Sequence, residues 1–291
     1  MVGRILLGLI AGVLAAGGAL AQQNRIDVVT PMAPELASYG HYDIGVRTLQ
    51  LTDPNRPDVL NTKEGGPIAR YDRPLTVEVW YPAKLAPGQK PGGEFQAITR
   101  DGTTVATLHG QAVRDAAPLT GDGAFPLVII SHGFPGNRYL LSHLGESLAS
   151  KGFVVVAIDH TDSTYDYQTS RDSARISALY NRSFAVLFVL HEMARLFAAT
   201  AKGFLGGLVD AGHTGLVGYS FGGYGVVNVV GGGYSQAAVA SPGAPPNKML
   251  ADRSGYSAGA PRDPDGAAPR EERGAGRGAG RAQRGDEPRA V

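Results

Sequence analysis

Three apolar runs, each followed by a segment with helical spacing, set the pattern in the middle of the chain. The apolar runs lie at residues 125–130, 153–158 and 214–217. A continuous run of this kind is typical of a strand that is buried on both faces of a parallel sheet. The helical segments lie at residues 140–150, at 176–201 and from 224 onward. Strands that alternate with helices predict an α/β fold with a doubly wound, mostly parallel sheet.

Two earlier segments show a different pattern. Residues 44–52 and 75–81 alternate apolar and polar side chains, as half-buried strands do. We expect these two strands to pair antiparallel at one edge of the sheet. Residues 53–70 carry turn residues and are expected to form a loop. Residues 82–123 are rich in Gly, Pro and Ala without a strong period, which predicts a long surface excursion.

The first 21 residues have the organisation of a secretory signal peptide. Arg4 precedes an apolar stretch at 5–16, and the small residues Ala19 and Ala21 precede Gln22. An uncleaved N-terminal anchor is the alternative, but the apolar stretch is short for a membrane span. We therefore expect a secreted or periplasmic protein that keeps no stable membrane span after cleavage.

The pattern of strands and helices ends near residue 240. Residues 254–291 consist mainly of Gly, Ala, Pro, Arg and acidic residues, with Val291 as the single branched aliphatic residue. Such a segment buries too little apolar surface to offset its conformational entropy, so residues 251–291 are predicted to be a disordered, low-complexity tail. Out-of-frame translation of a GC-rich gene and a natural terminus are both open as its origin.

Composition narrows the classes of function. A net charge of +1 over 291 residues gives no electrostatic basis for a nucleic-acid partner, and the acids of the tail nearly cancel its arginines. The chain has no cysteine, which excludes disulfides, thiolate metal sites and a cysteine nucleophile. With 43% hydrophobic and 18% charged residues, it has the makeup of a globular protein.

The third apolar run leads into a G-x-S-x-G motif at residues 218–222. Between a predicted strand and a predicted helix, this motif indicates a nucleophile elbow. The turn is so sharp that side chains two residues before and after Ser220 would clash, and glycine at both positions removes them. We expect the turn to raise the Ser220 hydroxyl above the sheet and to aim the next helix N-terminus at the reacting oxygen. An ordinary glycine-rich turn is the alternative.

A second motif, Ser-His-Gly-Phe-Pro-Gly at residues 131–136, directly follows the first apolar run. Ester hydrolysis passes through a tetrahedral oxyanion that needs two preorganised N–H donors. The backbone N–H of Phe221, the residue after the serine, is predicted to be one donor, and that of Phe134 the other. A helix-entry turn with a structural His132 is the alternative.

These motifs and their order resemble those of secreted α/β-hydrolases of the platelet-activating-factor acetylhydrolase and dienelactone-hydrolase-like group, and more distantly of cutinase-like polyesterases. The segments that carry the resemblance are 75–82, 128–136, 152–164 and 218–223. It implies a serine carboxylester hydrolase without cofactor or metal, acting on a small ester or lipid-like substrate through an acyl-enzyme. Ser220 matches the nucleophile, and Phe134 and Phe221 match the oxyanion-hole positions. Residues 22–250 then form a partial α/β-hydrolase domain.

The chain departs from this family pattern after the nucleophile. The family places an acid and then a histidine on loops after later strands. Every histidine here precedes Ser220: His41, His109, His132, His143, His160, His191 and His213. No apolar strand follows residue 240, and a serine hydroxyl is a weak nucleophile without a base. We therefore expect the last strands of the sheet to be missing, a strand edge to be exposed and esterase activity to be impaired.

Two roles are weighed for the segment Asp-His-Thr-Asp at residues 159–162, which follows the second apolar run. His160 lies where sites form in such folds and is a hypothetical substitute base, although a locally hydrogen-bonded loop residue explains it more simply. A metal site is the second hypothesis, but neighbouring side chains point apart and the sequence holds no second cluster of ligands, so no metal is predicted.

The sequence thus predicts a serine esterase of impaired activity, with a non-catalytic hydrolase-like binding protein as the alternative. It gives no indication of an oligomeric state.

Overall fold

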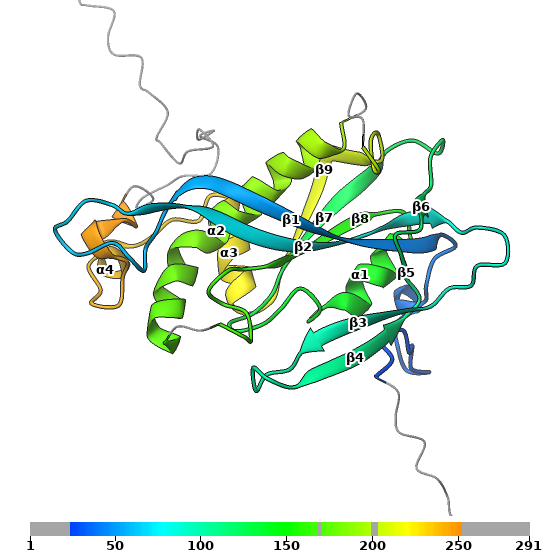
Figure 1. Cartoon of the computed structure of the whole chain (residues 1–291), viewed down its shortest axis with the longest axis horizontal. Coiled ribbons are helices and arrows are strands. Elements are labelled where there is room, and N and C mark those ends of the chain that lie inside the picture. Colours follow the sequence, from blue (N-terminus) through cyan, green and yellow to red (C-terminus); the bar gives the residue numbers. More distant parts are fainter. Residues whose placement is uncertain (1–23, 168–169, 199–202, 252–291) are drawn as a thin grey trace, which may run out of the picture.

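The computed structural model describes residues 24–167, 170–198 and 203–251 (Figure 1). The strands of its main sheet are β1 (Asp43–Pro57), β2 (Arg70–Lys84), β5 (Val113–Arg114), β6 (Ala117–Pro118), β7 (Phe125–Ser131), β8 (Val154–Asp159) and β9 (Val209–Gly218). The helices are α1 (Ser142–Ala149), α2 (Arg171–Leu196), α3 (Phe221–Val229) and α4 (Gln236–Val239), with short 3₁₀ helices η1 (Glu35–Ala37) and η2 (Pro246–Lys248). The predicted signal peptide at 1–21 and residues 252–291 of the predicted tail lie outside the described residues.

The three predicted apolar strands form one end of the sheet, with β9 at its edge. The sheet order is β5-β1-β2-β8-β7-β9, with β6 paired to β2. β7 pairs in parallel with β8 on one side and with β9 on the other. Side chains of β7 and β8 are almost entirely buried, because both faces of the sheet are covered here. The predicted alternation of strands and helices is confirmed, and β7 and β8 are buried as predicted. The prediction of burial for the third strand is wrong: residues of β9 are half-buried or exposed, because β9 lies at the edge of the sheet and no described strand covers its outer side.

The first two long strands make the sheet mixed. β1 and β2 pair antiparallel, as predicted, and β2 also runs antiparallel to β8. The parallel part of the sheet is therefore confined mainly to β8, β7 and β9. β1 extends to Pro57 and β2 begins at Arg70, so the loop between them is shorter than the predicted 53–70.

Residues 82–123 contain a hairpin that the sequence pattern did not predict. Its strands β3 (Gly93–Ile98) and β4 (Val105–Gly110) pair antiparallel as a separate two-stranded sheet. Phe95 docks the hairpin on the body of the protein: it is 1% exposed, and its ring centroid lies 6.2 Å from that of Trp80 and 5.5 Å from that of Tyr139. The surface excursion expected here is therefore partly regular and contributes to the core.

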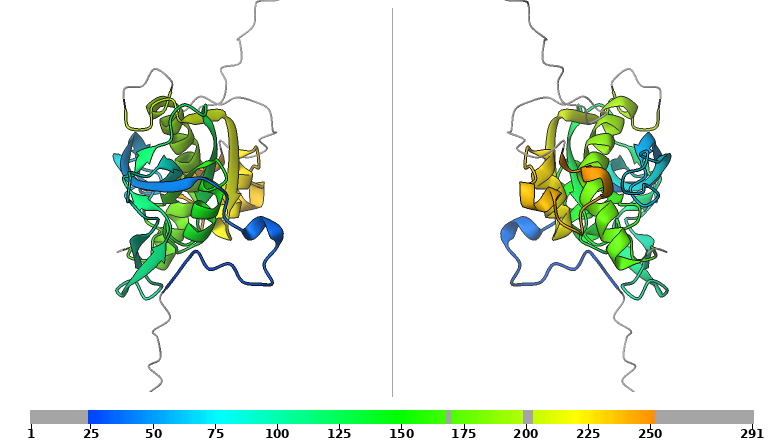
Figure 2. Two further views of the ribbon diagram at one scale, coloured as in Figure 1. Left: turned by 90° about the vertical axis from the view of Figure 1, so that its right-hand side faces the viewer. Right: turned by 90° about the vertical axis from the view of Figure 1, so that its left-hand side faces the viewer.

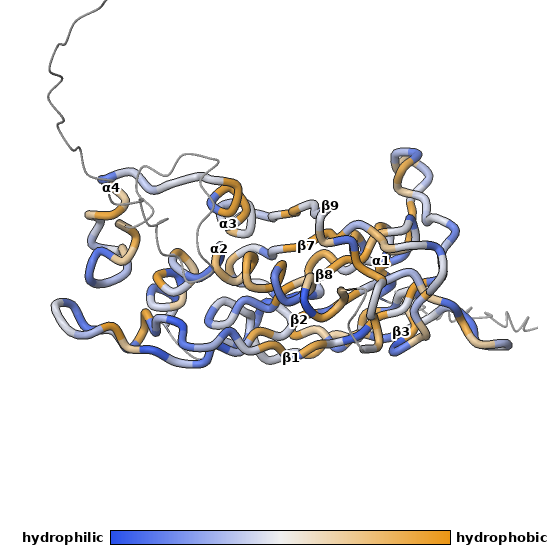
Figure 3. Tube along the Cα trace, turned by 90° about the horizontal axis from the view of Figure 1, so that it is seen from above, coloured by the Kyte–Doolittle hydropathy of each residue, from blue (hydrophilic) through white to orange (hydrophobic). Residues whose placement is uncertain are grey.

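Helices and hairpin cover the two faces of the sheet. The β3–β4 hairpin and α1 lie together on one face, where Trp80, Val128 and Val155 belong to one core cluster (Figure 1). α2 and α3 lie next to each other on the other face, where Val186 and Met193 of α2 belong to the second core cluster. Apolar residues accordingly gather along β7, β9 and α3 (Figure 3). The segment that carries η1 loops away from this body (Figure 2).

β9 forms an open edge of the sheet. Within the described residues it pairs with β7 alone, and no strand follows it. Val227 and Val230 of the following helical segment are 58% and 61% exposed. The exposed strand edge that the sequence predicts is thus present in the described part of the chain. None of the described helices combines the length and apolarity that crossing a membrane requires.

Candidate active site

The turn between β9 and α3 has the backbone geometry of a nucleophile elbow. β9 ends at Gly218 and α3 begins at Phe221, so Tyr219 and Ser220 alone make the turn. Ser220 has φ 52° and ψ −117°, a combination that residues with a side chain rarely adopt. Ser220 is exposed and stands at the N-terminus of α3, the positive end of the helix dipole. The backbone therefore presents its hydroxyl outward, where a substrate can reach it.

Close backbone approaches explain the glycines of the motif. A Cβ at position 218 would lie 2.5 Å from the carbonyl oxygen of Gly222. The N–H of Gly222 donates to the carbonyl oxygen of Tyr219 at 2.8 Å, which closes the turn. The sharp turn thus needs residues without side chains at both positions, as the motif implies.

Residues 131–136, which we call the oxyanion loop, lie directly against the elbow. The N–H of Tyr219 donates to the carbonyl oxygen of Ser131 at 3.0 Å. A Cβ on Gly133 would stand 3.4 Å from the Cβ of Ser220. The peptide bond between Phe134 and Pro135 in this loop is cis. The loop and the nucleophile position are therefore neighbours, although they come from different strands.

The structure brings the side chains of Phe134 and Phe221, the two residues predicted to supply oxyanion donors, close together. The ring centroids of Phe134 and Phe221 lie 5.7 Å apart. Within the described residues, neither backbone N–H donates a hydrogen bond. Two unused N–H groups beside an exposed serine fit the requirement of a tetrahedral oxyanion.

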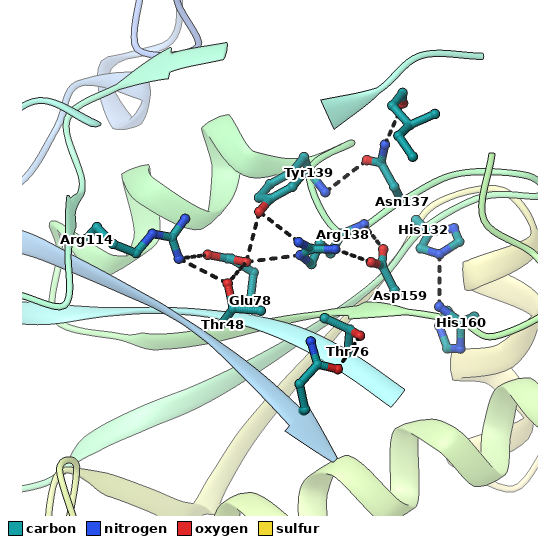
Figure 4. Close-up of polar contacts among 12 residues, drawn as sticks. Thr48, Thr76, Glu78, Arg114, His132, Asn137, Arg138, Tyr139, Asp159 and His160 are labelled. Carbon is teal, nitrogen blue, oxygen red and sulfur yellow. Dashed lines mark hydrogen bonds and ion pairs between the residues drawn. The ribbon is translucent and has the colours of Figure 1, made fainter. Parts of the chain in front are cut away.

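His132 and His160 are buried and bonded to partners other than Ser220. The Nδ1–H of His132 faces the carbonyl oxygen of Gly133 at 2.6 Å, and its Nε2 accepts the backbone N–H of His160 at 3.3 Å (Figure 4). The Nε2 of His160 lies 2.8 Å from the Oγ of Ser131. His160 is therefore a locally hydrogen-bonded residue, and this geometry does not support a role as substitute base.

Both histidines are neutral at physiological pH. Burial, with a further contribution from the positive charge of Arg182, lowers the pKa of His132 to about 3. Burial also lowers the pKa of His160 well below its usual value, with Arg182 and His132 adding to the effect. His132 thus serves as a fixed hydrogen-bond donor and acceptor that shapes the oxyanion loop.

Arg182 of α2 is a residue of this site that sequence reasoning missed. It is 1% exposed and donates to the carbonyl oxygens of His132 and Gly133, the latter at 2.8 Å. The sequence signal for it is weak: a single arginine just before the apolar stretch 184–186 of a helix. An arginine at such a position is commonly a surface residue, and only its three-dimensional partners identify it.

A second polar network anchors the residues that directly follow the oxyanion loop. The carboxylate of Glu78, which is fully buried, accepts hydrogen bonds from Arg138 Nε at 3.0 Å and from Tyr139 Oη at 3.1 Å (Figure 4). Arg138 also pairs with Asp159, and its backbone N–H donates to Asp159 Oδ1 at 2.6 Å. Because Glu78 lies in β2 and Asp159 ends β8, these bonds fix the chain after the loop to the sheet.

The residues at 159–162 point to different partners. Asp159 pairs with Arg138, whereas Asp162 pairs with Arg73 at 2.9 Å and accepts the hydroxyl of Ser177 at 2.8 Å. The described residues contain no group of three or more His, Cys, Asp or Glu side chains that would hold a metal ion. The side chains behind the metal hypothesis are therefore engaged in ion pairs and hydrogen bonds.

Phe134 of the oxyanion loop and Phe221 of α3 each lie next to a further aromatic side chain. Phe221 lies 4.9 Å from Tyr224 and Phe134 lies 6.3 Å from Tyr167, measured between ring centroids. Across the described residues, no hydrogen bond joins the Ser220 hydroxyl to a histidine or a carboxylate. The site therefore combines a nucleophile position, two candidate donors and neighbouring aromatic side chains, and no described side chain is bonded to Ser220 as a base.

Comparison with known proteins places this geometry in a family context. Residues 73–185 match the sequence profile of the family described as platelet-activating factor acetylhydrolase, isoform II. This match includes the oxyanion loop and Arg182 and ends before Ser220. In the solved structures, a ferulic acid esterase from Streptomyces cinnamoneus superposes with a TM-score of 0.51 at 26% identity, over 71% of this chain and 58% of that one. An α/β-hydrolase-like fold is thereby confirmed.

Two characterised relatives carry esterase names. A bis(hydroxyethyl) terephthalate hydrolase from Streptomyces coelicolor is 33% identical over 108 residues, which are 37% of this chain and 29% of that enzyme. A platelet-activating factor acetylhydrolase from Cavia porcellus is 34% identical over 88 residues, which are 25% of this chain and 20% of that enzyme. The chain thus spans less than a third of either relative. The resemblance to the acetylhydrolase group is confirmed over the matched region.

Proposed function

We propose that this chain is a serine carboxylester hydrolase in which Ser220 is the nucleophile and the backbone N–H groups of Phe134 and Phe221 form the oxyanion hole. The observation that carries the proposal is the conformation of Ser220, φ 52° and ψ −117°, at the exposed end of α3. Strained backbone of this kind persists where surrounding structure enforces it, and it gathers at active sites. The esterase names of the relatives support the same reaction class.

In the proposed reaction the Ser220 Oγ attacks the acyl carbon of an ester. Its proton passes to solvent water, and the carbonyl oxygen takes up the negative charge between the Phe134 and Phe221 N–H groups. The bond to the alcohol then breaks, the alcohol leaves with the proton, and water hydrolyses the acyl-enzyme to free acid and Ser220. Each oxyanion donor contributes about 100- to 1,000-fold to the rate in comparable enzymes.

We infer that acylation is slow, because no described side chain is placed to accept the proton of Ser220. All seven histidines precede Ser220 in the sequence. His132 in the oxyanion loop and His160, which is bonded to it, are committed to other hydrogen bonds. Without a base, Ser220 reacts only through the small fraction of hydroxyl that water deprotonates.

The substrate class follows from the aromatic side chains beside Ser220. Phe134, Phe221, Tyr224 and Tyr167 form a chain of neighbouring aromatic rings, which suits an uncharged ester with a lipid-like or aromatic acyl group. Terephthalate and ferulic acid, which the names of two relatives contain, are aromatic acids. We further propose that the substrate is met outside the cytoplasm, on the signal-peptide pattern of the first 21 residues.

The test is the reaction of purified protein with a fluorophosphonate probe, followed by peptide mass spectrometry. Slow labelling confined to Ser220, and absent in S220A, is the expected result. Turnover is then measured with p-nitrophenyl acetate, bis(hydroxyethyl) terephthalate and methyl ferulate. Labelling at other residues, or hydrolysis that S220A retains, would overturn the assignment. Fast labelling would overturn the inferred impairment, whereas substrate binding without any acylation would favour a non-catalytic binding protein.

A further inference from the structure

Arg182 is a buried cation whose partners are backbone and hydroxyl groups. It is 1% exposed. Its Nη2 donates to the Gly133 carbonyl oxygen at 2.8 Å and to the Oγ of Ser163 at 2.9 Å, and its Nη1 donates to the His132 carbonyl oxygen and faces the Oγ of Ser131 at 3.4 Å. Within the described residues, none of these partners carries a negative charge. A guanidinium that is buried without a counter-ion is costly, which makes a purely structural role a poor explanation.

The Gly133 carbonyl oxygen accepts two hydrogen bonds. The Nδ1–H of His132 approaches it at 2.6 Å, in addition to Arg182 at 2.8 Å. A trans peptide unit is planar, and its carbonyl and N–H point in opposite directions. The N–H on the other edge of this particular peptide unit belongs to Phe134. Two donors that fix the Gly133 oxygen therefore fix the direction of the Phe134 N–H.

Arg182 also contacts the element that carries the second donor. Its guanidinium carbon lies 5.6 Å from the ring centroid of Phe221. A Cβ added to Gly225 of α3 would stand 3.1 Å from the Cβ of Arg182, so a glycine lets α3 approach α2 at this point. One side chain thus touches the oxyanion loop and the helix that follows Ser220.

We propose that Arg182 is a positioning residue for the oxyanion hole: it clamps the Gly133–Phe134 peptide so that the Phe134 N–H is held ready for the substrate oxyanion. This inference rests on the proposed esterase function. Donation by a cation to the carbonyl also polarises the peptide, which strengthens its N–H as a donor. The charge itself lies in a desolvated setting, where it favours negative charge developing next to the loop.

Lysine does not replace arginine in this clamp. The guanidinium offers five N–H donors in a rigid plane, and the structure uses them on several acceptors at once. An ammonium group is a compact point charge that cannot span the same acceptors. Burial and the charge of Arg73 lower the pKa of Arg182 to about 9, so the side chain still carries its charge at neutral pH.

The clamp is tested by NMR with paired isotope labels, ¹³C at glycine carbonyls and ¹⁵N at phenylalanine. The chain has three Gly–Phe peptides: Gly133–Phe134, Gly152–Phe153 and Gly203–Phe204. Only these give one-bond carbonyl–amide signals, so the peptide in question has two internal controls. The variants are R182M, R182K and the matched control R195M, since Arg195 lies on the same helix with its side chain 66% exposed. Ser220 phosphonylation rates are measured on the same proteins.

In R182M we expect the Gly133 carbonyl and Phe134 amide signals to move and the amide to exchange faster with solvent, while the other two pairs stay in place. Ser220 labelling should slow about 100- to 1,000-fold, with an intermediate loss in R182K and none in R195M. If R182M does not fold, the Gly133–Phe134 signals of R182K serve as the test of the clamp.

Unchanged Gly133–Phe134 signals in a folded variant would overturn the clamp. Moved signals with an unchanged labelling rate would overturn its role in the reaction. If wild-type Ser220 is not labelled at all, the proposed function fails, while the amide signals still test the clamp.

Discussion

Gly222 packs directly against the start of the oxyanion loop, so that a Cβ at 222 would overlap the Ser131 carbonyl oxygen and stand 2.8 Å from that of His132. The elbow and the loop therefore share one backbone contact. Replacing Gly222 by alanine must push the two segments apart. We expect G222A to lose about 3 kcal/mol or more of unfolding free energy and to lose Ser220 labelling.

The matched control for this change is G215A in β9, the strand that leads into the elbow. A Cβ there would meet its nearest neighbour, a methyl of Val128, at 3.8 Å, an ordinary van der Waals contact. G215A should stay within about 1 kcal/mol of wild type in chemical denaturation. Equal losses in the two variants would contradict the close packing of the elbow.

Because of the backbone strain at Ser220, glycine should stabilise this position more than alanine, the reverse of the order inside a helix. Glycine adopts φ 52° and ψ −117° without a side-chain clash, whereas alanine keeps the strain. The greater freedom of glycine in the unfolded state offsets part of the relieved strain. The net expectation is that S220G is more stable than S220A by about 1 kcal/mol. Ser147, in the middle of α1, is the control position, and there alanine should be the more stable of the two. Urea denaturation of the four variants measures both differences.

The depressed pKa of His132 makes part of the stability dependent on pH. The unfolded chain binds a proton at His132 near the ordinary histidine pKa of 6.5, whereas the folded protein takes it up only near pH 3. The stability that this neutral side chain contributes is therefore complete above pH 6.5 and is lost as the pH falls toward 3. At pH 4 the loss is on the order of 3 kcal/mol.

Replacing His132 by asparagine removes this proton. The difference in unfolding free energy between wild type and H132N should therefore shrink from pH 7 to pH 4, as followed by urea denaturation at each pH. H191N, at an exposed position of α2, controls for replacing a histidine as such. A constant difference between wild type and H132N across this range would show that His132 does not titrate as its burial implies.

A site with a nucleophile and no base should respond to a base from solution. Imidazole at high concentration is expected to raise the rate of Ser220 phosphonylation about 10-fold or more, because it accepts the hydroxyl proton that no described side chain accepts. Mass spectrometry of the Ser220 peptide measures the modification itself and avoids the background hydrolysis that imidazole causes. A rate that is independent of imidazole would indicate that a base already acts on Ser220.

The elements that could be predicted from the sequence are those marked by a short, local pattern of residues. The apolar runs of β7, β8 and β9 and the glycines around Ser220 are continuous signals, so these strands and the elbow could be predicted. The β3–β4 hairpin was missed because Gly, Pro and Ala dominate its surroundings and few of its side chains, Phe95 and Ala97, are buried in the core.

The partners of buried polar groups could not be predicted in the same way. Arg182 reaches carbonyl groups 49 and 50 positions earlier in the chain, and no spacing in the sequence records that contact. His160 looked like a candidate base because of its place after a strand, but its bond to Ser131 depends on the pairing of β7 and β8. Local patterns predict elements, whereas polar partners follow from the assembled sheet.

The parallel pairing of β7 with β9 has a consequence for the order of folding. This pairing joins segments separated by the whole of α1, β8 and α2, and such long-range contacts form late because they close a long loop. Phe134 and Phe221 become neighbours only when that loop is closed. A partly folded chain with intact hairpins and helices would therefore carry Ser220 without its oxyanion hole, and the reactivity of this one hydroxyl would report the completion of folding.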